Sequence, residues 1–263
     1  MTVLEAIILG IIQGLTEFLP VSSSGHIVLG EAILNTQSSD NLLFAVMVHL
    51  ATVLSTMVVF YKDILNTVKG LLKFKWNDEA KFAVNILVSM IPVLFVGLFL
   101  KEEVEQFFDG KIAFVGAMLI VTGILLFVTI FATKKLKPLK PMSAFAIGVA
   151  QAIAVLPGIS RSGSTIATGL LLGINKTDIA RFSFLMVVPP IIGIALLDFK
   201  EYLESPADHL QSGVSLLAGF IAAFITGLVA CKWMIEIVKR GKIQYFAYYC
   251  FIVGAIAIVV GLK

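Results

Sequence analysis

Apolar runs of roughly 20 residues recur from one end of this 263-residue chain to the other, and they constrain its fold more than any other feature. A helix needs about 20 apolar residues to cross a bilayer. Only 14% of the residues are charged, whereas a soluble domain carries roughly 25%. The pattern therefore predicts an all-α integral membrane protein and excludes a soluble protein with one large core.

Six of the runs are continuous enough to be transmembrane helices. They lie at residues 41–61, 82–100, 112–132, 182–199, 214–231 and 244–262. Two further apolar regions, 2–34 and 143–174, are each interrupted by a Leu-Pro pair, at Leu19-Pro20 and at Leu156-Pro157. Because proline disfavours helix in the residue before it and lacks a backbone donor, each region should form two short helices joined by a turn. Such a re-entrant hairpin is tolerated at membrane depth where its tip faces protein or a watery cavity.

The two interrupted regions resemble each other in sequence. The segment LGIIQGLTEFLPVSSSG begins at Leu9, and the segment IGVAQAIAVLPGISRSG begins at Ile147. When the two are aligned, Gly10 matches Gly148 and Gln13 matches Gln151, each at a spacing of 138 positions. This similarity predicts an internal duplication within a single membrane domain of residues 1–263, with halves at about 1–138 and 139–263. Each half would hold one hairpin followed by three spans.

The charges of the connecting segments predict how the halves are oriented. Segments 62–81, 133–142 and 232–243 are basic, whereas 101–111 and 198–213 are rich in Asp and Glu. The positive-inside rule assigns the first three to the cytoplasm. Both termini then lie outside, the hairpins enter from opposite sides, and the halves form an inverted-topology repeat. Such repeats with broken helices hold their binding site near the midplane, where the two tips would meet.

The side chains expected at the tips are polar and ionisable. The first tip offers Gln13, Glu17, Ser22, Ser23, Ser24 and His26; the second offers Ser160, Arg161, Ser162, Gly163, Ser164 and Thr165. Arg161 is a fixed cation beside small hydroxyls, and a helix starting near Ser164 would point its free N–H groups at the same turn. These features predict an anion site, and phosphate is the best candidate.

Glu17 and His26 add chemistry that anion binding alone would not need. Ionisable residues at membrane depth are costly and usually functional. A serine oxygen could attack phosphorus while His26 takes its proton and Glu17 orients the imidazole or holds a metal ion. The structural alternative for four of the serines, Ser22, Ser24, Ser160 and Ser164, is that they cap helices.

Other ionisable or reactive residues carry weaker signals. His49 lies within the expected span at 41–61, where it could face the cavity or be a hydrogen-bonded packing residue, and His209 should be solvated in an acidic segment. Cys231 and Cys250 have neither metal nor redox spacing. No cleavable signal is expected at the N-terminus. The net charge of +3 lies in short connecting segments and implies no nucleic-acid partner.

Two motifs together, GLTEFLPVSSSGH and PGISRSGSTI, resemble those of the undecaprenyl-diphosphate phosphatase family of the bacitracin-resistance type, and the resemblance extends over essentially the whole chain, including FSFLMVVP at 182–189. It implies an enzyme of the bacterial cytoplasmic (inner) membrane that removes the terminal phosphate of undecaprenyl diphosphate at the outer face. The reaction regenerates the carrier lipid for peptidoglycan synthesis and confers bacitracin resistance by depleting the lipid that the antibiotic binds.

Carried onto this chain, the resemblance implies catalytic roles for Glu17, Ser23, His26 and Arg161, with Glu17 also binding a divalent cation, Mg2+ or Ca2+. The remaining tip residues would bind substrate. The first acidic position of the family motif is Gln13 here, which could supply only a neutral carbonyl ligand. Ser23 is the preferred nucleophile and His26 its base, while a histidine nucleophile and direct attack by water stay open.

A transporter is the alternative class of function. Inverted repeats with a polar midplane site are typical of secondary transporters, so the same architecture could flip a polyprenyl phosphate lipid, with Glu17 or His26 carrying a proton. The expected partners are a polyprenyl diphosphate and membrane lipids, and the sequence leaves a homodimer open.

Overall fold

The computed structural model describes residues 1–34, 42–100, 103, 107, 112–132, 136–193 and 213–262. This part of the chain is helical, as predicted. Its elements are α1 (Val3–Phe18), α2 (Ser23–Leu34), α3 (Leu42–Val59), α4 (Tyr61–Leu71), α5 (Asp78–Phe99), α7 (Ile112–Val128), the 3-10 turn η2 (Thr129–Phe131), α8 (Pro141–Ile153), α9 (Arg161–Leu171), α10 (Lys176–Met186), α12 (Gly213–Arg240) and α13 (Tyr245–Gly261).

The first interrupted region forms two helices and a turn, as predicted. α1 starts with a capping box in which Thr2 and Glu5 satisfy each other's backbone N–H groups. It ends at Leu19, which is extended (φ −67°, ψ 144°) because Pro20 follows. Ser22 then adopts φ +69°, a left-handed conformation that reverses the chain before α2 begins.

The second interrupted region has the same arrangement, in which a turn joins α8 to α9. Gly158 supplies φ +95° within that turn. Ser160 caps α9, since its hydroxyl accepts a hydrogen bond from the Gly163 N–H. α9 therefore begins at Arg161, and the predicted start near Ser164 was three residues too late.

Among the described residues, three helices are long and apolar enough to cross a membrane: Asp78–Phe99, Ile112–Phe131 and Gly213–Arg240. A fourth candidate is the pair Leu43–Val59 and Tyr61–Leu71, which are bent by 73° at the break between them. The predicted runs at 41–61, 82–100, 112–132 and 244–262 all coincide with helices. The run at 182–199 lies partly in α10, which starts at Lys176, and the residues beyond 193 lie outside the described part.

Two connectors differ from the prediction. Tyr61–Leu71 is the helix α4, and α12 continues through the basic segment to Arg240, where Gly241 (φ +69°) ends it. Charged side chains do not stop a helix, so composition placed the end of the run at 214–231 too early, whereas the run at 41–61 does end at the break between α3 and α4. The acidic segment 198–212, with His209, and most of 101–111 lie outside the described residues, as do Lys134 and Lys135.

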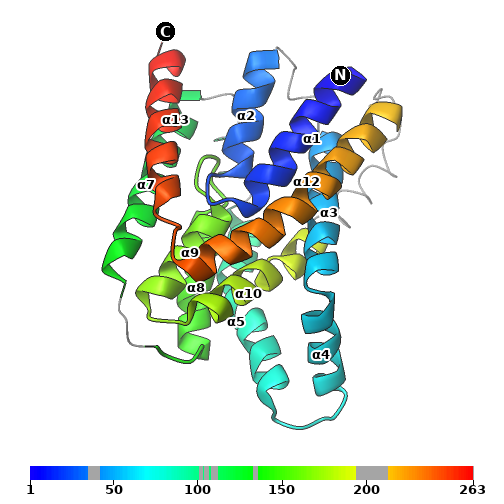
Figure 1. Ribbon diagram of the computed structural model, residues 1–263, viewed down its shortest axis with the longest axis vertical. Coiled ribbons are helices and arrows are strands. Elements are labelled where there is room, and N and C mark those ends of the chain that lie inside the picture. The colour runs from blue at the N-terminus through cyan, green and yellow to red at the C-terminus, as the bar shows by residue number, and fades with distance from the viewer. Residues whose placement is uncertain are drawn as a thin grey trace.

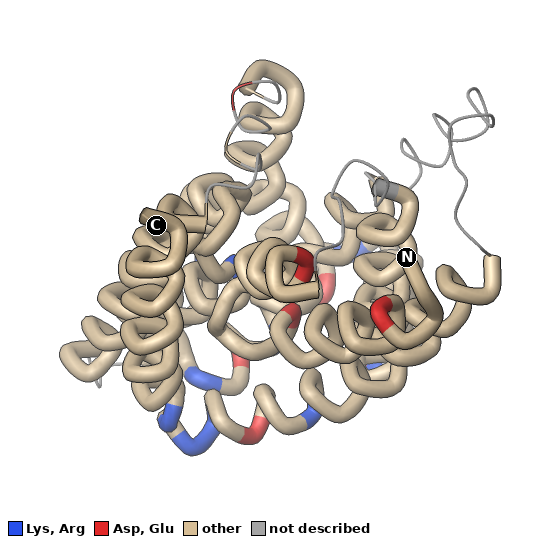
Figure 2. Tube along the Cα trace, turned by 90° about the horizontal axis from the view of Figure 1, so that it is seen from above, with Lys and Arg blue, Asp and Glu red and all other residues tan. Residues whose placement is uncertain are grey.

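The helices pack into a bundle in which the two hairpins enter from opposite ends (Figure 1). α1 packs along α12, α7 along α13, and α8 along α5. The two termini lie at the same end, away from the turn that joins α4 to α5 (Figure 1). Seen from above, charged residues are sparse along the described trace (Figure 2).

Glycines allow the helices of all three pairings to approach closely. A Cβ on Gly116 of α7 would lie 2.7 Å from the Gly254 carbonyl oxygen of α13, and a Cβ on Gly254 would lie 2.7 Å from that of Gly116. A Cβ on Gly10 of α1 would collide with a backbone carbonyl of α12, and one on Gly148 of α8 with a backbone carbonyl of α5. Any side chain at these positions would push the helices apart.

Candidate active site

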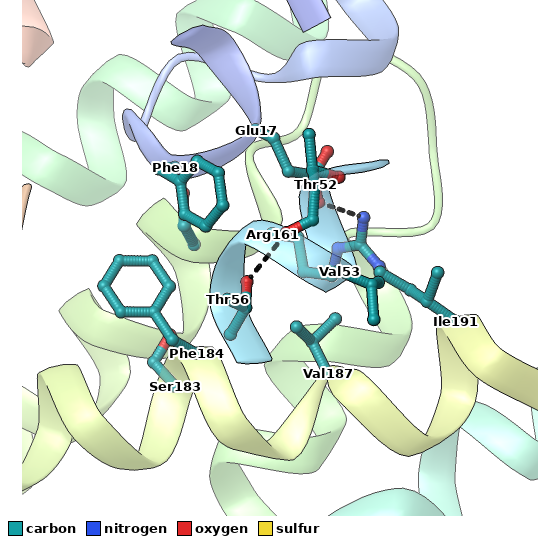
Figure 3. Close-up of a pocket in the computed structure, with 11 residues that line it drawn as sticks. Glu17, Phe18, Thr52, Val53, Thr56, Arg161, Ser183, Phe184, Val187 and Ile191 are labelled. Carbon is teal, nitrogen blue, oxygen red and sulfur yellow. Dashed lines mark hydrogen bonds and ion pairs between the residues drawn. The ribbon is translucent and has the colours of Figure 1, made fainter. Parts of the chain in front are cut away.

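The tips of the two hairpins meet at an ion pair. Arg161 Nη2 donates to Glu17 Oε1 at 2.7 Å, joining the first turn of α9 to the last turn of α1. The Glu17 side chain is 9% exposed and that of Arg161 is 29% exposed. Figure 3 shows the two groups facing each other. A buried carboxylate requires such partners, because desolvating it alone would be very costly.

Three side chains lie near the second carboxylate oxygen of Glu17. Ser23 Oγ donates to Glu17 Oε2 at 2.6 Å, and Gln13 Nε2 donates to the same oxygen at 3.0 Å. His49 Nε2 lies 3.9 Å from it, while His49 Nδ1 is bonded to the Ala45 carbonyl. Glu17 is thus the centre of the site, and His49 faces the cavity, one of the two roles left open by the sequence.

His26 makes no hydrogen bond to Ser23, although it would need one in order to take the Ser23 proton. Its Nδ1 lies 2.8 Å from the Ser22 carbonyl oxygen and its Nε2 lies 2.8 Å from the Tyr249 hydroxyl of α13. The two rings stack with centroids 5.6 Å apart. A carbonyl can only accept, so Nδ1 carries the proton and Nε2 accepts from Tyr249. The hydrogen bond of Ser23 goes to Glu17, and the imidazole near Glu17 is that of His49.

The second tip is anchored by backbone contacts that the sequence did not indicate. Thr122 of α7 accepts a hydrogen bond from the Ser160 N–H and donates to the Gly158 carbonyl, both at 3.0 Å. Ser162 Oγ donates to the Leu19 carbonyl of the first tip at 3.2 Å. The position of the α9 N-terminus is therefore held by both α7 and the opposite hairpin.

The start of α9 can bind an anion. The backbone N–H groups of Arg161 and Ser162 make no hydrogen bond to any described residue, as expected for the first turn of a helix. Free N–H groups and the positive end of the helix dipole attract phosphate. With the Arg161 guanidinium beside them, they are suited to bind an anion.

A cleft of about 390 Å³ opens beside the Glu17–Arg161 pair. One part of its wall is polar and includes Glu17, Ser23, Ser24, His49, Gln151, Ser160 and Arg161. Another part is apolar and includes Val46, Val93, Val155 and Ile191. This volume lies in the range of small-molecule sites. The separation of the wall into a polar and an apolar part suits a ligand with a charged head group and an apolar tail.

A smaller hollow also borders the ion pair. Its volume of about 20 Å³ suits a single water molecule, and Thr52, Thr56 and Ser183 contribute hydroxyls to its wall. Figure 3 shows Thr52 beside Glu17, with Thr56 and Ser183 below the ion pair. The hollow is too small for a phosphate, so the larger cleft is the candidate site for substrate.

The predicted tip residues separate into two groups. Glu17, Ser23, Ser24, Ser160 and Arg161 line the cleft. The others, Gln13, Ser22, His26, Ser162, Gly163, Ser164 and Thr165, do not line it in this structure.

Several residues of the second group have structural contacts instead. Ser22 Oγ accepts from the Gly25 N–H at 3.3 Å and so caps α2, just as Ser160 caps α9. The Thr165 hydroxyl donates to the Arg161 carbonyl at 2.9 Å. Ser164, which was also considered as a cap, is buried within α9.

The described residues can contribute to a cation site but do not form a complete one. Gln13 Oε1 is buried beside Glu17 and has no hydrogen-bond partner among the described residues, so it is free to act as a neutral ligand. The oxygens of Glu17 already accept from Arg161, Ser23 and Gln13. No group of three His, Cys, Asp or Glu side chains that could hold a metal occurs in the described ranges.

Comparison with known proteins gives a consistent result. The model of the family described as "Bacitracin resistance protein BacA" matches residues 6–256. A Bacteroides fragilis protein named undecaprenyl-diphosphatase is 54% identical over 259 residues, which cover 97% of each chain. Proteins of the same name from Bacteroides thetaiotaomicron and Korarchaeum cryptofilum are 52% and 41% identical, over 100% and 97% of each chain.

Proposed function

The chain belongs to the family of the bacitracin resistance protein BacA, and from this membership we propose that it hydrolyses undecaprenyl diphosphate, the activity for which its relatives are named. It is a multi-pass membrane enzyme, a phosphatase acting on a phosphorus-containing anhydride. The products are inorganic phosphate and undecaprenyl phosphate, the carrier lipid of peptidoglycan synthesis. The observation that carries the proposal is the contact of Ser23 and Arg161 with opposite oxygens of Glu17 beside a cleft.

The hydrogen bond from Ser23 to Glu17 supports a serine nucleophile with a carboxylate base. Ser23 Oγ attacks the terminal phosphorus, and its proton passes to Glu17 Oε2, 2.6 Å away. The bond from phosphorus to the bridging oxygen breaks, and the lipid monophosphate leaves with the electron pair. Water then attacks the phosphoserine, inorganic phosphate is released, and the proton returns to Ser23 Oγ.

Charge neutralisation is the main requirement for phosphoryl transfer. Arg161 has N–H groups beyond the one bonded to Glu17, and the first N–H groups of α9 lie beside it. These donors bind the phosphate oxygens without needing to reorganise, which favours the transition state. Gln13 Oε1 and Glu17, together with phosphate oxygens of the substrate, would hold the divalent cation, Mg2+ or Ca2+. When bound, the cation would supply further neutralisation.

The apolar part of the cleft indicates where the lipid lies. Val46 of α3, Val93 of α5 and Ile191 form part of the apolar wall of the cleft. The prenyl tail passes between these elements into the bilayer, while only the diphosphate enters the polar end. The enzyme therefore tolerates shorter prenyl chains, and hydrolysis restricted to the full-length lipid would contradict this proposal.

The two halves are related as an inverted-topology repeat, with six crossings and two re-entrant hairpins. Gly116 and Gly254, which contact each other reciprocally, are 138 positions apart, as are Gly10 and Gly148. In the first half the hairpin helix α1 packs against α12 of the second half, and in the second half the hairpin helix α8 packs against α5 of the first half. Both facts support a two-fold axis that passes between α7 and α13.

The cleft opens to the outer face of the cytoplasmic membrane. Val46 lies near the start of α3 and Val93 near the end of α5, away from the basic connector between α4 and α5. The positive-inside rule assigns that connector to the cytoplasm. The common location of both termini at the opposite end (Figure 1) agrees with this orientation.

Phosphate release from a short-chain prenyl diphosphate by the detergent-purified protein tests the proposal. We expect Glu17→Gln, Ser23→Ala and Arg161→Ala each to reduce release by about 100-fold or more, and EDTA to reduce it in the wild type. Glu236→Gln is the matched control, because Glu236 forms an exposed ion pair with Arg240. Folded wild-type protein that releases no phosphate with any divalent cation would contradict the proposed activity.

A further inference from the structure

Gln13 and Gln151 occupy corresponding positions in the two hairpins, and both side chains are buried, with exposures of 0% and 2%. In the first hairpin, Gln13 donates to the carboxylate four residues later, Glu17, one helical turn away. In the second hairpin, the residue four positions after Gln151 is Val155. The buried amide of Gln151 therefore lacks the carboxylate partner that its counterpart has.

The amide of Gln151 is unpaired within the described ranges. Its Oε1 is enclosed and has no hydrogen-bond partner, and no hydrogen bond of its Nε2 occurs there either. Buried amides are nearly always hydrogen-bonded, because leaving them unpaired costs free energy. The Nε2 group is not enclosed, and because Gln151 lines the cleft together with Val155, Ser160 and Arg161, a bound ligand can accept a hydrogen bond from Nε2.

An anion is the ligand that this wall of the cleft can bind. The Arg161 guanidinium lies on the same wall, and its positive charge attracts an anion to it. An amide N–H donates readily to a phosphate oxygen, and such bonds to charged groups are stronger than those between neutral groups. We infer that Gln151 is a substrate-binding residue that donates to a phosphate oxygen of the diphosphate, as Gln13 donates to Glu17. This inference rests on the proposed function for the identity of the ligand.

Binding of a non-hydrolysable prenyl methylene-bisphosphonate to the purified protein, measured by calorimetry, tests the inference without requiring turnover. Gln151→Met keeps the length of the side chain but removes the amide, and we expect it to weaken binding about 10-fold or more. Gln151→Glu places a negative charge beside the ligand and should weaken binding further. If Gln151→Met does not fold, Gln151→Asn, which withdraws the amide from the cleft, replaces it with the same expected weakening.

The matched control is Asn85→Leu. Asn85 is also a buried amide, 4% exposed, whose Oδ1 has no partner among the described residues, but it lines a separate pocket beside Asp63 and Arg181. We expect Asn85→Leu to bind the bisphosphonate as the wild type does. Equal weakening in Asn85→Leu and Gln151→Met, or wild-type binding by folded Gln151→Met, would overturn the inference.

Kinetics separate this inference from the proposed function. In the phosphate-release assay, Gln151→Met should raise KM about 10-fold and change kcat little, because the contact is made in the bound ground state as well as in the transition state. A wild type that binds the bisphosphonate but releases no phosphate would contradict the proposed activity and leave the Gln151 contact intact. Unchanged KM in an active, folded Gln151→Met would contradict the contact alone.

Discussion

At the scale of single residues, the Ser22 carbonyl fixes which nitrogen of the His26 imidazole carries the proton, and the Tyr249 hydroxyl donates to the other nitrogen. We expect Tyr249→Phe to keep the ring stack, lose the donor and destabilise the protein by about 1 kcal/mol, the usual net contribution of a hydrogen bond, which a lower Tm in detergent would show. Tyr248→Phe is the control, because the Tyr248 ring packs on Phe127 and its hydroxyl bonds no described residue; it should retain the wild-type Tm. Equal Tm values for wild type and Tyr249→Phe would mean that the hydrogen bond to His26 contributes no stability.

At the scale of elements, the contact between α8 and α5 sets the position of the second tip. Because a Cβ on Gly148 would collide with the Ser89 carbonyl, Gly148→Ala should displace α8, destabilise the protein by about 1–3 kcal/mol and lower phosphate release. The matched control is Gly97→Ala in α5, where a Cβ would meet nothing within 4 Å. It should be neutral or stabilise the helix by up to about 1 kcal/mol. Thermal unfolding in detergent measures both variants, and equal Tm values would show that α8 can shift without cost.

At the scale of the whole molecule, the direction in which the cleft opens can be measured by labelling single cysteines. Cys231 and Cys250 are fully buried and should not react with an impermeant maleimide. Phe74 and Glu103 are exposed at opposite ends of α5. We expect Glu103→Cys to react in intact cells and Phe74→Cys only after lysis. The reverse pattern would place the cleft on the cytoplasmic side.

The sequence by itself was enough to predict that this chain is helical, that two regions are broken by Leu-Pro, and that Glu17 and Arg161 belong to tips that face each other. These conclusions depend on local chemistry. Proline breaks a helix wherever it occurs, and an apolar run of about 20 residues has few alternatives to a membrane helix. The repeat in sequence then related the two tips, and the ion pair between them agrees with that prediction.

Only the tertiary structure decided which side chains pair within the site. Ser23 and His26 lie three residues apart in α2, yet Ser23 contacts Glu17 while His26 contacts Tyr249, 223 positions away in the chain. Which face of α2 meets α1 and which meets α13 depends on how the helices rotate as they pack, and that rotation is set by contacts between distant segments. Thr122 and His49 became part of the site for the same reason, since their positions in α7 and α3 carry no local motif. Local sequence therefore specifies the elements and the chemical groups they carry, and packing specifies which of those groups meet.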